Sequence, residues 1–184
     1  DMGELAQAGV IGFSDDGSPV KNPEIMRQAL EKSRELGLPV IDHCEEPSLV
    51  EGGQMNDGAL AERLGLRGIP PASEEIMVSR DIMLASMTGG HVHIAHVSTA
   101  GSVRIIRKAK ARGVPVTCET APHYFALTYE ALLRYGTDAK MNPPLRSEED
   151  RLEVLRGLAD GTIDAIASDH APHAPCEKAR PLSE

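Results

Sequence analysis

The chain has 184 residues, of which 41% are hydrophobic and 26% are charged, and its formal net charge at pH 7 is −9. This composition is typical of one folded domain and excludes the class of low-hydropathy, highly charged disordered chains. The acidic balance argues against a nucleic-acid partner, because phosphate contacts require a basic patch. No apolar run approaches the roughly 18 to 20 residues of a membrane-spanning helix, and the first residues do not resemble a signal peptide. We therefore expect a small-molecule partner and no membrane association.

Cysteine usage favours a reducing cytoplasm. The three cysteines, Cys44, Cys118 and Cys176, are an odd number, lie far apart and form no CxxC pair. This spacing predicts neither a disulfide framework nor a zinc site made of thiolates.

Short apolar runs alternate with segments of helical periodicity, a pattern typical of βα units around a parallel sheet. In chain order, strands are expected at residues 10–14, 38–43, 91–97, 114–119 and 163–168. The first helix, about residues 22–36, is indicated by its ends: Asn22 is an N-cap, Pro23 takes the first helical position and Gly37 follows the last turn. Residues 45–69 are expected to form a long loop with a short helix near residues 59–64. Long loops at strand ends often build functional sites.

Three further helices are predicted at residues 73–87, 99–112 and 147–159. In the first of them we expect an inward apolar stripe, formed by Ile76, Met77, Met83, Leu84 and Met87. The basic side of the second is interpreted as solvated surface. The third begins with a capping-box variant, Ser147 and Asp150, and is expected to bury Leu152, Leu155 and Leu158.

Polar residues follow each strand at its carboxyl end, the edge where barrels and doubly wound sheets carry their chemistry. Aspartates follow the first and fifth strands at Asp16 and Asp169, and histidines follow the second and third at His43 and His96. Two imidazoles and two carboxylates from separate strands form a ligand set typical of zinc hydrolases.

The pair His91 and His93 is the competing candidate, since HxH on a strand is also a metal-ligand pattern. Strand alternation places His96 on the face of Val92 and Ile94, and His91 and His93 on the opposite face. We therefore interpret His91 and His93 as structural. The same alternation places Cys44 on the face opposite His43, as packing.

Six segments together resemble the bacterial dihydroorotases of the amidohydrolase superfamily, over essentially the whole chain. They are GFSDDG (12–17), DHCEE (42–46), IAHVSTAGS (94–102), CETAPHYF (118–125), KMNPPLRS (140–147) and SDHAPHAPCEK (168–178). The resemblance implies part of a metal-dependent (β/α)8 barrel, roughly strands four to eight, with residues 1–184 forming its C-terminal part.

The resemblance also implies the site. It makes Asp16, His43 and His96 metal ligands, Asp169 a catalytic base that also touches the metal, and Asn142 and His173 substrate contacts. The implied cofactor is zinc, one or two ions. The implied reaction is the reversible cyclisation of N-carbamoyl-L-aspartate to L-dihydroorotate in pyrimidine biosynthesis. In the hydrolytic direction, Asp169 takes a proton from the attacking water and returns it to the leaving ring nitrogen. His123, His170, Glu119 and Tyr124 either orient the ligands or are polar residues satisfied within the fold.

Two departures from the family pattern matter. FSDDG offers no lysine of the kind that is carboxylated and bridges two metals in many relatives. The first-strand HxH pair of the family, and its adjoining arginine, are absent from these 184 residues. A complete barrel takes roughly 250 residues, so we expect the chain alone to be catalytically inactive.

Three other interpretations stay open at this point. The first is that the chain is part of another cyclic amidase, such as an allantoinase or hydantoinase. The second is a non-catalytic relative that binds aspartate transcarbamoylase, and the third is a flavodoxin-like binding module with an open sheet.

Besides the small-molecule substrate, the expected protein partners are aspartate transcarbamoylase or a second copy of this chain.

Overall fold

A computed structural model describes residues 1–15 and 17–183. Within them, the main sheet has five strands, all parallel, in the order β1-β2-β5-β6-β7. The strands are β1 (Phe13–Ser14), β2 (Val40–Asp42), β5 (Val92–Ile94), β6 (Val116–Thr120) and β7 (Ala165–Ile166). All five lie inside or next to the predicted segments. Main-sheet neighbours follow one another along the chain, which is the order of a (β/α)8 barrel, and the fold is part of such a barrel.

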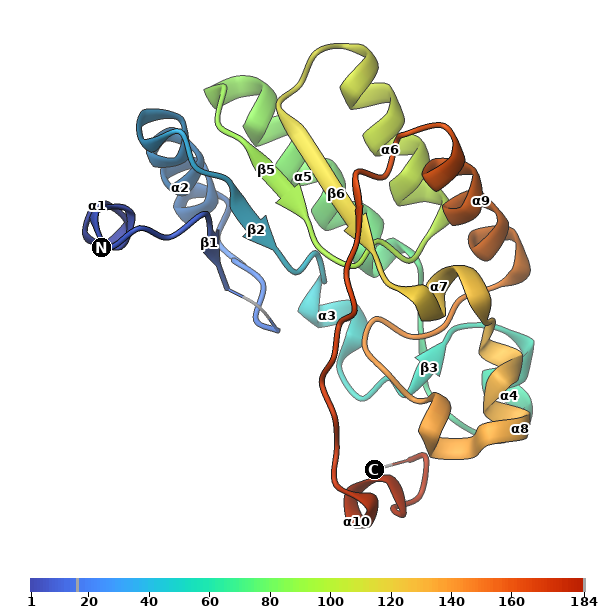
Figure 1. The fold of residues 1–184 in the computed structure, drawn as a ribbon. Coiled ribbons are helices and arrows are strands. Elements are labelled where there is room, and N and C mark those ends of the chain that lie inside the picture. The colour runs from blue at the N-terminus through green and yellow to red at the C-terminus, as the bar shows by residue number, and fades with distance from the viewer. Residues whose placement is uncertain (16, 184) are drawn as a thin grey trace.

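Helices cover one face of this sheet (Figure 1). In succession they are α2 (Pro23–Leu36), α5 (Ala72–Thr88) and α6 (Ala100–Ala111), and α9 (Glu148–Ala159) packs against α6. The main core lies between these helices and the sheet and includes Met26, Leu30, Val78, Ile82, Val92, Ile94, Val103 and Ile106. The opposite face of the sheet carries half-buried side chains, Ile41, His93 and Thr117 among them.

A second apolar cluster lies beyond the carboxyl ends of β2, β5 and β6 (Figure 1). It includes residues of the short elements β3 (Met55–Asn56), α4 (Ala59–Leu64), α7 (Pro122–Ala126), η1 (Tyr129–Ala131), α8 (Leu132–Tyr135) and η2 (Gly136–Ala139). Strand β4 (Gly68–Ile69) pairs with β3, and α3 (Pro47–Val50) contacts β4. The Tyr124 hydroxyl in this cluster donates to the Pro143 carbonyl over 2.8 Å. This bond anchors the segment 140–147 above the sheet edge.

Two terminal helices complete the chain, α1 (Met2–Gln7) and α10 (Pro175–Lys178). An extended segment joins β7 to α10 and runs away from the sheet (Figure 1). Among the described residues, no helix is both long and apolar enough to cross a membrane.

Helix ends agree with the predictions, because they depend on local chemistry. The Asn22 side chain accepts from the Glu24 amide, and Gly37 ends α2 with φ 69°. Ser147 and Asp150 form the reciprocal capping box of α9.

The predicted helix faces were partly wrong. In α5, Ile76, Met83 and Met87 are 51%, 71% and 63% exposed. The inward face of α5 instead alternates apolar with polar residues, and Glu74 and Asp81 are buried on it. In α9, Leu152 and Leu155 are likewise exposed, and Val154 and Gly157 are buried.

Candidate metal centre

Two imidazoles converge at the carboxyl edge of the sheet. His43 directly follows β2, and His96 lies two residues after β5. The His43 Nδ1 and His96 Nε2 atoms are 2.7 Å apart, and the rings meet edge-on with centroids 4.6 Å apart. Both side chains are buried, at 4% and 6% exposure. The sequence prediction that these strand ends bring His43 and His96 together is matched by this geometry.

Strand alternation, from which the position of His96 was predicted, does not explain that position and was the wrong reason. Val92 and Ile94 point into the core beneath the helices, so simple alternation would send His96 there too. The strand ends at Ile94, and His96 has φ 36°, a left-handed backbone conformation. This turn places His96 beside His43. The competing pair lies elsewhere: His91 Nε2 and His93 Nδ1 each lie 2.8 Å from Thr117 Oγ1.

Glu45 joins this site and was not predicted as a site residue. Its Oε2 lies 3.2 Å from His43 Nε2, and its carboxylate also accepts a hydrogen bond from Asn142. Burial alone would raise the pKa of Glu45, but hydrogen bonds from His43 and Asn142 outweigh it and lower the pKa. Glu45 therefore connects a predicted metal ligand to a predicted substrate contact. Its position two residues after His43 in HCEE was the available signal.

Asp169 and His123 both lie close enough to His96 for their charges to interact. Asp169 is exposed, with φ 48°, and its negative charge acts on both His96 and His123. The pKa of His96 is lowered chiefly by burial and by the nearby His43, and the charges of Glu74 and Asp169 oppose this shift. Burial likewise lowers the pKa of His123. Within the described residues, no group bonds the buried Nε2 of His123, so His123 is not a satisfied polar residue.

The remaining candidate site residues lie in several different places. Asp16 lies outside the described residues. Asn142 and His173 line the same cavity of about 440 Å³, and His173 Nδ1 lies 3.7 Å from Glu177 Oε2. His170 is exposed. Glu119 Oε2 lies 3.4 Å from His93 Nε2, on the half-buried face of the sheet.

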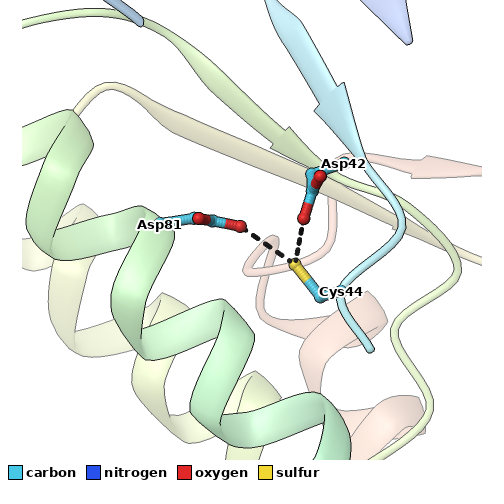
Figure 2. A group of neighbouring side chains, drawn as sticks. All are labelled: Asp42, Cys44 and Asp81. Atoms are coloured by element: carbon cyan, nitrogen blue, oxygen red, sulfur yellow. Dashed lines mark hydrogen bonds between the residues drawn. The ribbon is translucent and has the colours of Figure 1, made fainter. Parts of the chain in front are cut away.

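A polar cluster of Asp42, Cys44 and Asp81 lies between the end of β2 and α5 (Figure 2). Cys44 Sγ is 3.4 Å from Asp42 Oδ2 and 3.5 Å from Asp81 Oδ2, and all three side chains are buried. Burial, with the charges of Asp81 and Asp42, raises the pKa of the Cys44 thiol well above its usual value. Burial and the neighbouring Asp42 raise the pKa of Asp81 to about 8.

This cluster is a poor metal site, although its ligand atoms lie within 4.8 Å of one another. The thiol and one carboxyl hold protons at neutral pH, and metal binding would require their loss. Arg80 already compensates the charge: its Nη2 is 2.7 Å from Asp81 Oδ1 and 3.8 Å from Asp42 Oδ2. The cluster instead fixes the end of β2 against α5. Because Asp42 and Cys44 flank His43, their bonds also set the direction of His43.

The donor set at the His43–His96 centre fits a divalent transition-metal ion. Neutral imidazole nitrogens and carboxylate oxygens are usual ligands of such ions. Here two buried imidazoles meet edge-on, the Asp169 charge acts on one of them, and among the described residues nothing bonds the buried Nε2 of His123. Buried nitrogens without partners are costly unless a ligand or water completes them.

Comparison with solved structures shows the fold. The chain is similar to the L-hydantoinase (dihydropyrimidinase) from Arthrobacter aurescens, with a TM-score of 0.82 and 24% identity, covering 96% of this chain and 41% of that one. It is also similar to the dihydropyrimidinase from Brevibacillus agri, with a TM-score of 0.75 and 23% identity, covering 93% of this chain and 39% of that one.

Comparison with curated sequences is more specific. The chain is 61% identical over 178 residues to the dihydroorotase of Geobacter sp. (strain M21), and 60% identical over 178 residues to that of Pelotomaculum thermopropionicum. Each alignment covers 97% of this chain and 42% of the relative, so the chain spans less than half the length of these relatives. Residues 1–102 match the family described as Dihydro-orotase-like. The chain belongs to the dihydro-orotase-like family.

Proposed function

We propose that this chain carries the C-terminal part of the barrel, and much of the active site, of a zinc-dependent dihydroorotase. The reaction is the reversible cyclisation of N-carbamoyl-L-aspartate to L-dihydroorotate. The observation that carries the proposal is the convergence of His43 and His96, 2.7 Å apart, at the carboxyl edge of a partial barrel. The identity of about 60% to proteins named dihydroorotase supports the choice of substrate.

His43, His96 and Asp169 would hold the metal, with Asp16 joining them by its place in the GFSDDG segment. One or two zinc ions fit this inventory. When bound, zinc polarises a carbonyl and lowers the pKa of water to near neutrality. Burial lowers the pKa of His96, so its imidazole is neutral at pH 7 and has a lone pair to offer.

The remaining roles belong to side chains around the centre. In ring opening, Asp169 accepts a proton from the attacking water and delivers it to the leaving ring nitrogen. Asn142 and His173 contact the substrate. The Glu45 carboxylate forms hydrogen bonds with both Asn142 and His43. Glu45 therefore positions a proposed substrate contact and a proposed metal ligand at the same time.

The rival functions are weaker on the same observations. A non-catalytic partner of aspartate transcarbamoylase has no physical need for two buried imidazoles facing each other. The hydantoinase and dihydropyrimidinase structures described above share the fold at 23–24% identity, well below the identity to dihydroorotases. Association with aspartate transcarbamoylase or a second copy is compatible with the proposal. Three free cysteines, Cys44, Cys118 and Cys176, fit a cytoplasmic enzyme.

A chimera tests the proposal. The matched 178 residues of the Geobacter sp. (strain M21) dihydroorotase are replaced by this chain, and ring opening of dihydroorotate, allantoin and hydantoin is measured. We expect turnover of dihydroorotate alone, lost on chelation and restored by zinc. Turnover of hydantoin or allantoin instead would assign another cyclic amidase. A folded, zinc-loaded chimera without turnover would favour the non-catalytic reading.

A further inference from the structure

The turn that carries His96, residues 95–99, is strained and is held in place by its surroundings. His96 has φ 36°, in the left-handed region that residues other than glycine seldom adopt. Its side chain is also buried, at 6% exposure. A backbone of this kind costs conformational energy and persists only where neighbouring groups fix it. The groups that bond this turn therefore determine where the His96 imidazole lies.

One carboxylate accepts most of the hydrogen bonds at the end of this turn. Glu74 lies in the first turn of α5 and is 3% exposed. Its Oε1 accepts from the Ser98 amide over 3.1 Å and from the Thr99 amide over 3.2 Å. The Thr99 hydroxyl donates to the same oxygen over 3.3 Å, and the Ser98 hydroxyl donates to Oε2. Four donors of two consecutive residues thus converge on one side chain of another element.

The residue that follows His96 is held from the neighbouring strand β6. The Val97 amide donates to the Glu119 carbonyl over 2.8 Å. The Thr120 hydroxyl donates to the Val97 carbonyl over 2.7 Å. Backbone and side chain of β6 therefore hold the turn from one side, and Glu74 holds it from the other.

The Glu74 carboxylate is itself fixed and lies close enough to act on His96. Arg146 Nη2 is 3.9 Å from Glu74 Oε2, and Arg146 Nε donates to Ser98 Oγ over 3.1 Å. Burial and the neighbouring His43 lower the pKa of His96, and the charge of Glu74 opposes this shift. Glu74 therefore has one defined position, from which it bonds the turn.

We propose that Glu74, assisted by Thr120, is a positioning residue of the metal centre: its carboxylate holds the left-handed turn that places His96 beside His43. The inference rests on the proposed function, because His96 is a metal ligand in that proposal. Glu74 and Thr120 belong to neither the proposed metal ligands nor the proposed substrate contacts. Groups that orient a metal ligand typically contribute about 10- to 100-fold in metal affinity or activity.

NMR of the metal-free 184-residue chain, with EDTA present throughout, tests the positioning directly. The His43 and His96 ring centroids are 4.6 Å apart, so their ring protons should show a nuclear Overhauser effect. Glu74→Met removes every acceptor and should abolish this effect. Glu74→Gln keeps one oxygen for the two amides and should restore it. Both variants remove the charge near Arg146, so their difference reports the hydrogen bonds of the turn.

A milder variant tests the other side of the turn. Thr120→Val keeps the shape of the side chain and removes its hydrogen bond to the Val97 carbonyl. It should weaken the nuclear Overhauser effect without abolishing it. If circular dichroism shows that Glu74→Met does not fold, Thr120→Val decides the result.

The matched control removes a buried bond at the opposite end of β5. Ser33 is buried, and its hydroxyl donates to the Leu38 carbonyl over 2.6 Å and accepts from the His91 amide over 3.2 Å. Ser33→Ala should lower stability and leave the effect between His43 and His96 unchanged. This control separates positioning from a general loss of stability.

The chimera with the Geobacter sp. (strain M21) dihydroorotase provides the second measurement. Zinc affinity is determined by competition with a chromophoric chelator, and kcat and KM are determined for dihydroorotate. Glu74→Met should weaken zinc binding and lower kcat by about 10- to 100-fold, with KM nearly unchanged because Asn142 and His173 are untouched. Glu74→Gln should recover most of both losses.

Three outcomes would overturn the proposal. One is an unchanged nuclear Overhauser effect in both Glu74→Met and Thr120→Val, and another is an equal loss in Glu74→Met and Glu74→Gln. The third is the absence of the effect in the unchanged chain, because His96 would then not be held beside His43. A chimera without turnover would contradict the proposed function and leave the metal-free result standing.

Discussion

Arg146→Met should destabilise the chain strongly, because the Arg146 side chain connects several segments through buried hydrogen bonds. Arg146 is 3% exposed. Its guanidinium donates to Ser98 Oγ over 3.1 Å, to Asn56 Oδ1 over 3.1 Å and to the Ile69 carbonyl over 3.0 Å. Glu74, buried and 3.9 Å away, shares this network. Burial lowers the pKa of Arg146, while the charge of Glu74 opposes that shift.

The magnitude follows from what the substitution leaves behind. Methionine fills much of the volume but leaves three acceptors without the Arg146 donor. It also removes the guanidinium that lies 3.9 Å from the buried Glu74 carboxylate, which keeps its hydrogen bonds from Ser98 and Thr99. Removing one partner of a buried ion pair typically costs about 3–5 kcal/mol. For a urea m-value of about 2 kcal/mol/M, the unfolding midpoint should fall by about 1.5 to 2.5 M.

Urea unfolding followed by circular dichroism measures this shift. The matched control is Arg104→Met, which removes an exposed ion pair to Glu149 on the surface of α6. It should leave the midpoint unchanged within error. The double variant Arg146→Met/Glu74→Gln should lose less than the sum of its single variants. Equal midpoints for Arg146→Met and Arg104→Met would refute the reasoning.

Three further outcomes are expected. Asp81 has a pKa of about 8 in the folded chain against 3.8 ordinarily, so the native state binds the extra proton and the contribution of Asp81 to stability should be lost as pH rises from about 4 to 8; between pH 6 and 9, urea titrations should show a smaller fall in Asp81→Asn than in the unchanged chain, and an equal fall would contradict it. His96 has a lowered pKa, so the folded state resists its protonation and its contribution, opposite in sign to that of Asp81, should be lost as pH falls below 6.5; His96→Gln should therefore lose less stability between pH 7 and pH 5 than the unchanged chain, and an equal loss would contradict it. Gly90→Ala should lower the thermal midpoint by several degrees, because a Cβ at Gly90 would collide with the Leu30 carbonyl; an unchanged midpoint would show that the backbone shifts enough at Gly90 to accommodate the added methyl group.

Local chemistry explains what was predictable from the sequence. Helix ends depend on one or two neighbouring residues, so Asn22, Gly37 and Ser147 marked them correctly. The five main strands followed from short apolar runs between helical segments. Because parallel strands end at a common edge, His43 and His96 were expected to meet, and they do.

Long-range contacts explain the rest. The inward face of α5 carries Glu74 and Asp81, whose buried partners lie far away in the sequence, so apolar periodicity alone selected a face of which only part is buried. The left-handed turn at His96 is not encoded by strand alternation. Glu45 became a site residue through its contact with His43 and through its bond to Asn142, and the second of these lies nearly a hundred positions later in the sequence.

The most direct test of the central claim is the Asp169→Asn variant of the chimera with the Geobacter sp. (strain M21) dihydroorotase. Ring opening of dihydroorotate is assayed together with the zinc content of the purified protein, and His170→Asn, an exposed neighbour, is the control. We predict that Asp169→Asn lowers kcat by about 10²–10⁴-fold, the contribution of a general base, while His170→Asn has little effect. A chimera whose Asp169→Asn variant turns over dihydroorotate at the original rate would contradict the account.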